Sequence, residues 1–75
     1  MPRHDDPFEA REIMEAIASA QAAYREAVIA VDLLGLSYRE AADALRTRES
    51  TITTHLHRGR QHIALALKGE LRPAG

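Results

Sequence analysis

Apolar side chains recur at three- and four-residue spacing along most of the chain, which is the period of helices that each bury one face. In the first two segments with this spacing, the apolar residues are Ile13, Met14, Ile17, Val28, Ile29, Val31 and Leu34. No segment alternates apolar and polar residues with the two-residue period of a strand. The pattern predicts an all-α fold: a small four-helix domain without a β-strand wing.

Local signals predict where the first helix begins. Asp6 precedes Pro7, and Glu9 follows three positions after Asp6, so a capping side chain, a first-turn proline and a capping-box acid coincide. We therefore expect a helix from about Pro7. The apolar spacing fades after Ala18, and we expect a short connection over residues 19–22.

The second predicted helix covers residues 23–34 and ends at Gly35, because glycine adopts the left-handed conformation that terminates helices. Leu36 is expected to pack back on this turn. Ser37 and Glu40 then form an S-x-x-E capping box, which predicts a third helix running to about Arg46.

A break of only a few residues follows, with Thr47 as the expected N-cap of a final helix over residues 48–68. On a helical wheel, one side of this helix carries Ile52, Leu56, Gly59, Ile63 and Ala66. The opposite side carries Ser50, Thr53, Thr54, His57 and Gln61. Glu49 lies in the first turn, and Arg48, Arg58 and Arg60 flank the polar side.

A short capped helix, a tight turn and a longer helix with a polar face are typical of a helix-turn-helix. In that motif the first helix crosses the DNA backbone and the second reads bases in the major groove. Hydroxyl, amide and imidazole groups can bond to base edges, while arginines can bind phosphates. We expect the five residues of the polar side, the three flanking arginines and Glu49 to form the DNA-binding site. The pattern alone also permits a generic unit of two packed helices.

Charge changes this picture when it is counted by segment. The net charge of the whole chain is −1, yet residues 1–45 carry four Arg against nine Asp and Glu. Residues 46–75 carry six Lys and Arg against two Glu. The C-terminal half can therefore present a positive surface to phosphate, although ordinary solvated helix faces would give the same count.

Length limits the chain to one small domain, since 75 residues bury only about 60% of their unfolded surface. We expect a tail over residues 1–6, the domain over residues 7–69 and a second tail over residues 70–75. There is no cysteine, and no apolar run approaches the roughly 20 residues that span a bilayer. We therefore expect a cytoplasmic protein without a membrane segment, monomeric in isolation.

The stretch "YREAVIAVDLLGLSYREAADAL" and the later "TITTHLHRGRQHIALAL" resemble region 4 of bacterial extracytoplasmic-function sigma factors, from about Ala23 to Leu67. In that family a "REAV...GLSY.EIA..L" pattern precedes a recognition helix close to "GTVKSRLHRGR". The resemblance implies a four-helix domain that binds the minus-35 promoter element and contacts the flap of core RNA polymerase. An anti-sigma factor is a further candidate partner.

Positions that match the family pattern are Thr51, Ile52, Leu56, His57, Arg58, Gly59 and Arg60. Ser50 stands for the family's glycine, Thr53 for its lysine, Thr54 for its serine and His55 for its arginine. With two positive charges missing, we expect weaker and less salt-dependent DNA binding than in the family. The family's "LP" before the second helix is also absent, which predicts a less defined first turn. Because 75 residues leave no room for region 2, we expect an excised domain or a fragmentary relative.

Two alternatives remain open. The chain also resembles the LuxR-type effector domain, because "GLS..E.A..L" and "TI.THL" are similar to that family and His55 fits it better. Tyr38, the "HRGR" tail and the "VDLLG" run favour the sigma factor. Alternatively, the same helices form a docking module for an anti-sigma factor or another regulator, without DNA specificity.

The sequence gives no sign of catalysis, a metal site or a cofactor. His55, His57 and His62 do not form a convergent ligand set, and no cysteine or acidic residue joins them on one face. We expect these histidines to be exposed or to face DNA. No Ser-His-Asp arrangement or glycine-rich phosphate loop is present, so we predict that the protein is not an enzyme.

Overall fold

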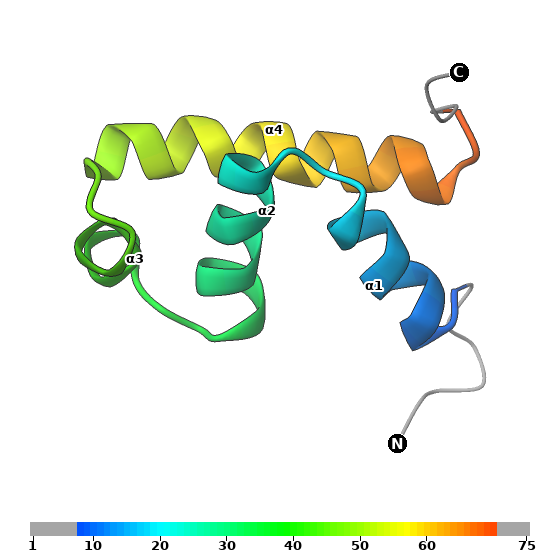
Figure 1. Ribbon diagram of the computed structural model, residues 1–75, viewed down its shortest axis with the longest axis horizontal. Coiled ribbons are helices and arrows are strands. Elements are labelled where there is room, and N and C mark those ends of the chain that lie inside the picture. The colour runs from blue at the N-terminus through cyan, green and yellow to red at the C-terminus, as the bar shows by residue number, and fades with distance from the viewer. Residues whose placement is uncertain (1–7, 71–75) are drawn as a thin grey trace.

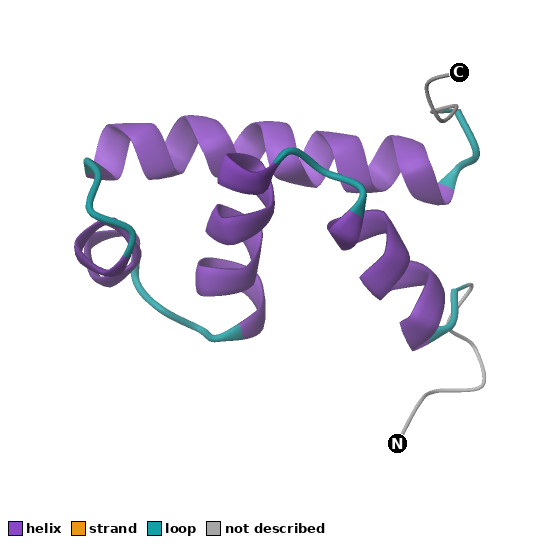
Figure 2. Ribbon diagram, viewed as in Figure 1, coloured by secondary structure: helices purple, strands orange, loops and turns teal. Residues whose placement is uncertain are grey.

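The computed structural model describes residues 8–70, and these form four α-helices and one π-helical segment (Figure 1). The elements are α1 (Ala10–Ala18), α2 (Ala22–Val28), η1 (Ile29–Leu33), α3 (Tyr38–Ala44) and α4 (Glu49–Leu67). Short loops connect them, and none of the residues described forms a strand (Figure 2). The prediction of a small all-α domain with a helix-turn-helix, here α3 and α4, is confirmed.

The long helix α4 runs along one side of the domain, and α1, α2 and α3 each pack against it (Figure 1). At the middle of α4, Ala27 and Val28 of α2 bury Leu56. Nearer its N-terminus, a second cluster joins η1, α3 and α4 through the buried residues Ala30, Ala41, Ala42 and Ile52. Alanines at these contacts let the helix backbones approach closely, so that Ile52 and Leu56 are each only 1% exposed. The predicted apolar side of the last helix is thus confirmed at its centre.

The predicted start of the first helix is wrong. The chain is still non-helical at Phe8 and Glu9, and α1 begins at Ala10 with Glu9 as an N-cap whose side chain makes no capping hydrogen bond. Asp6 and Pro7, which carried the prediction, lie outside the described residues. A capping sequence is only a local preference, and tertiary packing decides where the helix starts.

Fewer of the apolar side chains of this helix are buried than their spacing predicted. Ile17 is 4% exposed, but Ile13 and Met14 are 37% and 52% exposed. The small residues Ala16 and Ala20 are buried in their place. A short helix packed against α4 covers only a narrow stripe, so the outer apolar side chains stay accessible.

Side chains fix the turn between α1 and α2, contrary to the expectation of a less defined turn. The Ser19 hydroxyl donates a hydrogen bond to the Ala16 carbonyl oxygen at 2.8 Å. The Arg25 guanidinium donates to the carbonyl oxygens of Ala18 at 3.2 Å and Ala20 at 3.1 Å. These bonds satisfy carbonyls that a helix end leaves unpaired, so the turn does not need a proline.

The second helix widens into a π-helical turn, which the sequence did not predict. The Leu34 N–H donates to the Ile29 carbonyl oxygen five residues back, at 2.9 Å. This wider turn shifts the side chains that follow relative to an α-helix. As a result Leu34, predicted to be buried, is 68% exposed, whereas Ala30 is buried. Gly35 then ends the segment at φ 72°, as predicted, and Leu36 packs against the cluster of Ala30, Ala41, Ala42 and Ile52.

The capping box of α3 is confirmed, because the Ser37 N–H donates to Glu40 Oε1 at 2.8 Å and the Glu40 N–H donates to Ser37 Oγ at 3.0 Å. The helix ends at Ala44, slightly before the predicted position. Arg46 follows in the left-handed conformation at φ 56°.

The predicted N-cap of the last helix is wrong by one position. Arg48, not Thr47, is the N-cap of α4, and its side chain makes no capping hydrogen bond. Thr47 is half-buried in the turn, and its N–H donates to the Ala42 carbonyl oxygen at 2.9 Å. The turn therefore uses Thr47 to close α3 and leaves the first turn of α4 without a side-chain cap.

Gly59 lies where α2 comes nearest to α4. A Cβ atom added there would lie 2.6 Å from Val28 Cγ2 and 2.9 Å from the Tyr24 carbonyl oxygen. Val28 is a buried β-branched residue with little rotational freedom, and the carbonyl of Tyr24 belongs to the backbone of α2. Any larger residue at this position would therefore push the two helices apart.

Gly59→Ala is expected to destabilise the domain by about 1 to 3 kcal/mol, because the overlap outweighs the higher helix propensity of alanine. Thermal melts followed by circular dichroism would measure this. Gln61→Ala, an exposed change on the same helix, is the control and should stay within about 0.5 kcal/mol of the parent. A higher melting temperature for Gly59→Ala would contradict the close approach.

Candidate nucleic-acid interface

One side of α4 is left uncovered by the other helices (Figure 1). We call this side the recognition face, and it consists of the exposed residues Ser50, Thr53, Thr54, His57 and Gln61. Four of these residues, together with Arg58, line one shallow hollow: Thr53, Thr54, His57 and Gln61. The polar residues that the helical wheel brought together in the sequence thus share one continuous exposed surface.

The two threonines of the recognition face use their hydroxyl hydrogens within the helix. Thr53 Oγ1 donates to the Glu49 carbonyl oxygen at 3.0 Å, and Thr54 Oγ1 donates to the Ser50 carbonyl oxygen at 3.2 Å. Each hydroxyl keeps its lone pairs as acceptors, and each side chain keeps a methyl group. Toward a base pair they offer an acceptor for an amino group or an apolar contact for a thymine methyl.

Arg48 and Arg58 retain the exposure expected of phosphate-binding residues. Among residues 8–70, the ion pairs join Arg11 with Glu15 and Arg60 with Asp32, so neither Arg48 nor Arg58 is neutralised there. Arg58 lies at the edge of the recognition face and contributes to its hollow. Both guanidinium groups are accessible to a phosphate oxygen.

Arg60 differs from the sequence-based picture of a phosphate-binding residue. Its Nε and Nη2 atoms donate to the Oδ2 and Oδ1 atoms of Asp32 at 2.9 and 2.6 Å, a bidentate pair between α4 and η1. The helical wheel placed Arg60 at the border between the apolar and polar sides, and the structure pairs it with an acid from the other half of the chain. Its charge is therefore largely neutralised within the domain.

Hydrogen bonding to Arg60 holds the pKa of Asp32 below its ordinary value of 3.8, more strongly than partial burial raises it. The same hydrogen bonds raise the pKa of Arg60, to which Tyr38 makes a smaller contribution. The side chains of Arg60 and Asp32 are 52% and 33% exposed. Solvent screens the pair at this exposure, so it contributes modestly to stability.

Two of the three histidines of α4 are less exposed than the sequence predicted. His55 is half-buried, with its ring 5.3 Å from the ring of Tyr24 between centroids. His62 is also half-buried, and its Nε2 lies 2.8 Å from Ser19 Oγ. Because that hydroxyl already donates its hydrogen to Ala16, His62 Nε2 must be the donor. His57 alone of the three is exposed, on the recognition face.

A second surface feature is an apolar groove between α1, the α2–η1 segment and the C-terminal half of α4. Its apolar lining consists of Ile13, Ile17, Val28, Leu33, Ile63, Ala64 and Leu67, and Asp32 and Arg60 also line it. The groove shares no residue with the hollow on the recognition face. The domain therefore has two separate surfaces of different chemistry.

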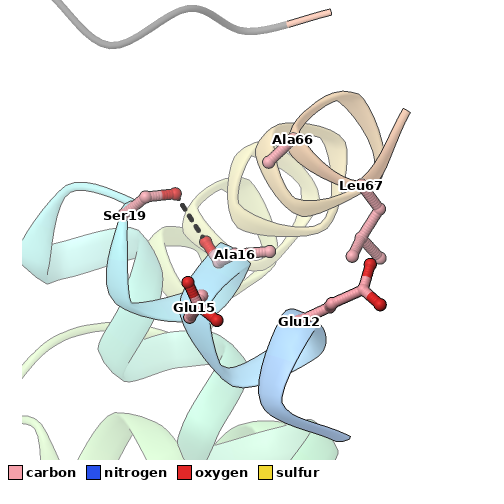
Figure 3. A pocket seen from close by; sticks show the side chains of 6 residues that line it. All are labelled: Glu12, Glu15, Ala16, Ser19, Ala66 and Leu67. Atoms are coloured by element: carbon pink, nitrogen blue, oxygen red, sulfur yellow. Dashed lines mark hydrogen bonds between the residues drawn. The ribbon is translucent and has the colours of Figure 1, made fainter. Parts of the chain in front are cut away.

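A third hollow lies between α1 and the end of α4 (Figure 3). Glu12 and Glu15 line it, with Ser19 turned back onto the Ala16 carbonyl (Figure 3). Among the residues described, no three metal-binding side chains gather at one point. No helix within residues 8–70 is long and apolar enough to cross a membrane.

Sequence reasoning missed Asp32 as the partner of Arg60. The two residues are 28 positions apart, and no local pattern connects them. It also missed the left-handed conformation of Arg46. There a signal existed, because two capped helices separated by so few residues require a sharp turn, and such a turn commonly needs a residue with positive φ.

The chain matches the model of a known family. The model of the family described as "Sigma-70, region 4" matches residues 10–63, which is well over half of the chain. The matched segment includes the whole of α1, α2, η1 and α3 and most of α4, with every residue of the recognition face. No solved structure matches the chain.

Asp32→Asn should cost about 1 kcal/mol of stability at pH 7, after allowance for the exposure of the pair. Because the pKa of Asp32 is lowered in the folded protein, its contribution is present above pH 3.8 and is lost as the pH falls through the folded value. The stabilities of the variant and the parent should therefore converge in denaturant melts as the pH falls below the lowered pKa of Asp32.

Asp43→Asn is the control for this measurement. Asp43 is an exposed acid on α3 without an ion pair among residues 8–70, so its replacement should change stability by less than about 0.5 kcal/mol. A difference between Asp32→Asn and the parent that persisted at low pH would show that the lost stability does not come from the ionised pair.

Proposed function

Because the chain belongs to the sigma-70 region 4 family, we propose that it binds the minus-35 promoter element as region 4 of an extracytoplasmic-function sigma factor. In this role it supports transcription initiation by bacterial RNA polymerase. The recognition face of α4 reads base edges in the major groove, and Arg48 and Arg58 bind flanking phosphates. The family match favours the sigma factor over the LuxR-type alternative.

The exposed recognition face is the observation that carries this proposal. A helix that packs on one side needs apolar residues only on that side, and its outer side can carry any polar or charged residue. Here the outer side gathers two threonines, a serine, a histidine and a glutamine, all of them exposed. Hydroxyl, amide and imidazole groups of short to medium reach suit base-edge contacts, where the geometry of the hydrogen bonds decides which base is preferred.

The charges around the recognition face support binding with modest salt dependence. Arg60 is paired with Asp32, and the family's basic residues are replaced by Thr53 and His55. Each phosphate neutralised by a cation adds about 0.9 to the slope of log affinity against log salt. Because the domain has fewer accessible cations than the family pattern, it binds promoter DNA less tightly than a protein with that pattern, and its affinity depends less steeply on salt concentration.

We further propose that the apolar groove receives the flap of core RNA polymerase. The groove lies apart from the recognition face, which would let DNA and polymerase bind at the same time. Two apolar residues of its lining are well exposed, Ile13 at 37% and Leu33 at 51%. Apolar side chains this exposed on a small domain are typical of a protein contact.

An anti-sigma factor is the alternative occupant of this groove, and the same apolar exposure supports it. If the helices serve only to dock such a regulator, as in the docking-module hypothesis, the domain should behave differently with DNA from a promoter-binding domain. A docking module that serves only regulators would bind every duplex alike, whereas a promoter-binding domain prefers one sequence. Selection of bound duplexes from a random pool would decide between them and would also identify the preferred site.

Thr54→Ala is expected to cost about 1 to 3 kcal/mol of binding free energy on the selected site and little on random-sequence DNA. Fluorescence anisotropy with both duplexes would measure this. Thr54→Ser keeps the hydroxyl, and Thr54→Val keeps a branched side chain with methyl groups. Whichever of the two retains affinity identifies the acceptor or the methyl group as the part that is read.

Arg58→Ala gives the matched comparison in the same experiment. A phosphate contact carries no sequence information, so this change should weaken binding to both duplexes and lower the salt slope by about one. Equal losses for Thr54→Ala and Arg58→Ala on both duplexes would contradict the assignment of the recognition face.

Thr53→Lys adds a cation to the recognition face and should strengthen binding to both duplexes, with a salt slope larger by about one. Glu26→Gln, which raises the net charge by the same single unit at an exposed position on α2, tests for a general effect of net charge. If both variants gained affinity equally, position 53 would not lie at the DNA surface.

A further inference from the structure

The turn between α3 and α4 holds an arginine where the rest of the domain uses glycine. Among residues 8–70, three residues have positive φ: Gly35 at 72°, Gly69 at 74° and Arg46 at 56°. A side chain in this left-handed region crowds its own backbone, which glycine avoids. Arg46 is therefore strained relative to a glycine at the same position.

The hydrogen bonds of this turn show why positive φ is required. The Arg46 N–H donates to the Asp43 carbonyl oxygen at 3.3 Å, and the Thr47 N–H donates to that of Ala42 at 2.9 Å. The end of α4 has the same pair of bonds, from Gly69 to Ala66 and from the next residue to Leu65. This arrangement is the Schellman motif, whose left-handed position is usually glycine.

Within residues 8–70, the Arg46 side chain makes no polar contact. It is exposed, and among the described residues it takes part in neither of the two ion pairs nor in any side-chain hydrogen bond to a neighbour. Its contribution to folding is therefore unfavourable. Strained residues that folding does not need are concentrated at functional sites.

The position of Arg46 indicates what it contacts. It precedes the N-cap Arg48 by two residues, with half-buried Thr47 between them, so two exposed guanidinium groups lie at the start of α4. In a helix-turn-helix the first helix crosses the DNA backbone and the start of the second enters the groove. The turn between them therefore runs beside the phosphates at the edge of that groove.

We propose that Arg46 binds a DNA phosphate, and that the domain retains its strained backbone for this contact. The inference rests on the proposed DNA-binding function and adds a residue outside the recognition face and its flanking arginines. A guanidinium group forms charge-assisted, often bidentate, hydrogen bonds with phosphate, which a glycine at this position cannot supply. The contact is independent of base sequence.

The decisive variant is Arg46→Gly, which should affect stability and binding in opposite directions. Loss of strain should raise the melting temperature by about 3 to 6 °C. Loss of the phosphate contact should weaken binding to a random-sequence duplex about tenfold and lower the salt slope by about one. Thermal melts and anisotropy titrations at several salt concentrations would measure both effects on the 75-residue chain.

Two further variants serve as controls. Arg46→Lys keeps the charge and the strain, so its melting temperature and salt slope should stay near those of the parent. Arg11→Gln removes the same charge from α1, where Arg11 is 80% exposed and pairs with Glu15 at 3.6 Å. It should leave the affinity and slope for DNA unchanged.

The possible results separate this inference from the proposed function. If Arg46→Gly bound as tightly as the parent, with the same salt slope, the phosphate contact would be refuted while sequence-specific binding through Thr54 would stand. Equal losses of DNA affinity for Arg46→Gly and Arg11→Gln would also refute the phosphate contact, because the loss would then be an effect of net charge. An unchanged or lower melting temperature for Arg46→Gly would show that Arg46 is not strained, and the inference would lose its basis. A parent chain that bound no DNA would overturn both proposals.

Discussion

The close approach of α2 and α4 at Gly59 is the constraint on which the arrangement of the domain depends. Without a Cβ atom at this position, the backbone of α2 lies against α4, and Val28 and Leu56 bury each other. This contact fixes the rotation of α4 about its own axis. The recognition face then points away from the other helices because the opposite side of α4 is occupied. The orientation of the recognition face thus follows from the absence of one side chain on the opposite side of the helix.

Electrostatic pairing decides which arginines keep an accessible charge. The N-terminal part of the chain is acidic and the C-terminal part is basic, yet the two are not independent in the fold. Asp32 from η1 neutralises Arg60 of α4, while Arg46, Arg48 and Arg58 keep accessible charges. A guanidinium group with a carboxylate at hydrogen-bonding distance has little left to offer a phosphate. The count of basic residues by segment therefore overstated the charge available to nucleic acid.

Elements with strong local signals were predictable. Ser37 and Glu40 form the capping box that their spacing indicated, and Gly35 has the positive φ that its place after an apolar run required. The start of α1 was misplaced, because a cap sequence at Asp6 and Pro7 does not compel a helix to begin there. The π-helical turn was missed as well. It leaves Leu34 exposed by changing the phase of the helix, and periodicity analysis assumes a constant phase.

The sequence by itself determined the all-α class, the helix-turn-helix, the buried stripe of α4 through Ile52 and Leu56 and the polar residues opposite it. These follow from spacing and caps, which act over a few residues. Only the tertiary structure decided that Arg60 pairs with Asp32, that His55 lies against Tyr24 and that Arg46 is left-handed. These features depend on how segments far apart in the chain meet, or on the path that joins two packed helices. A helical wheel describes one helix only, so it does not show which charged or aromatic side chain of a neighbouring helix packs against it.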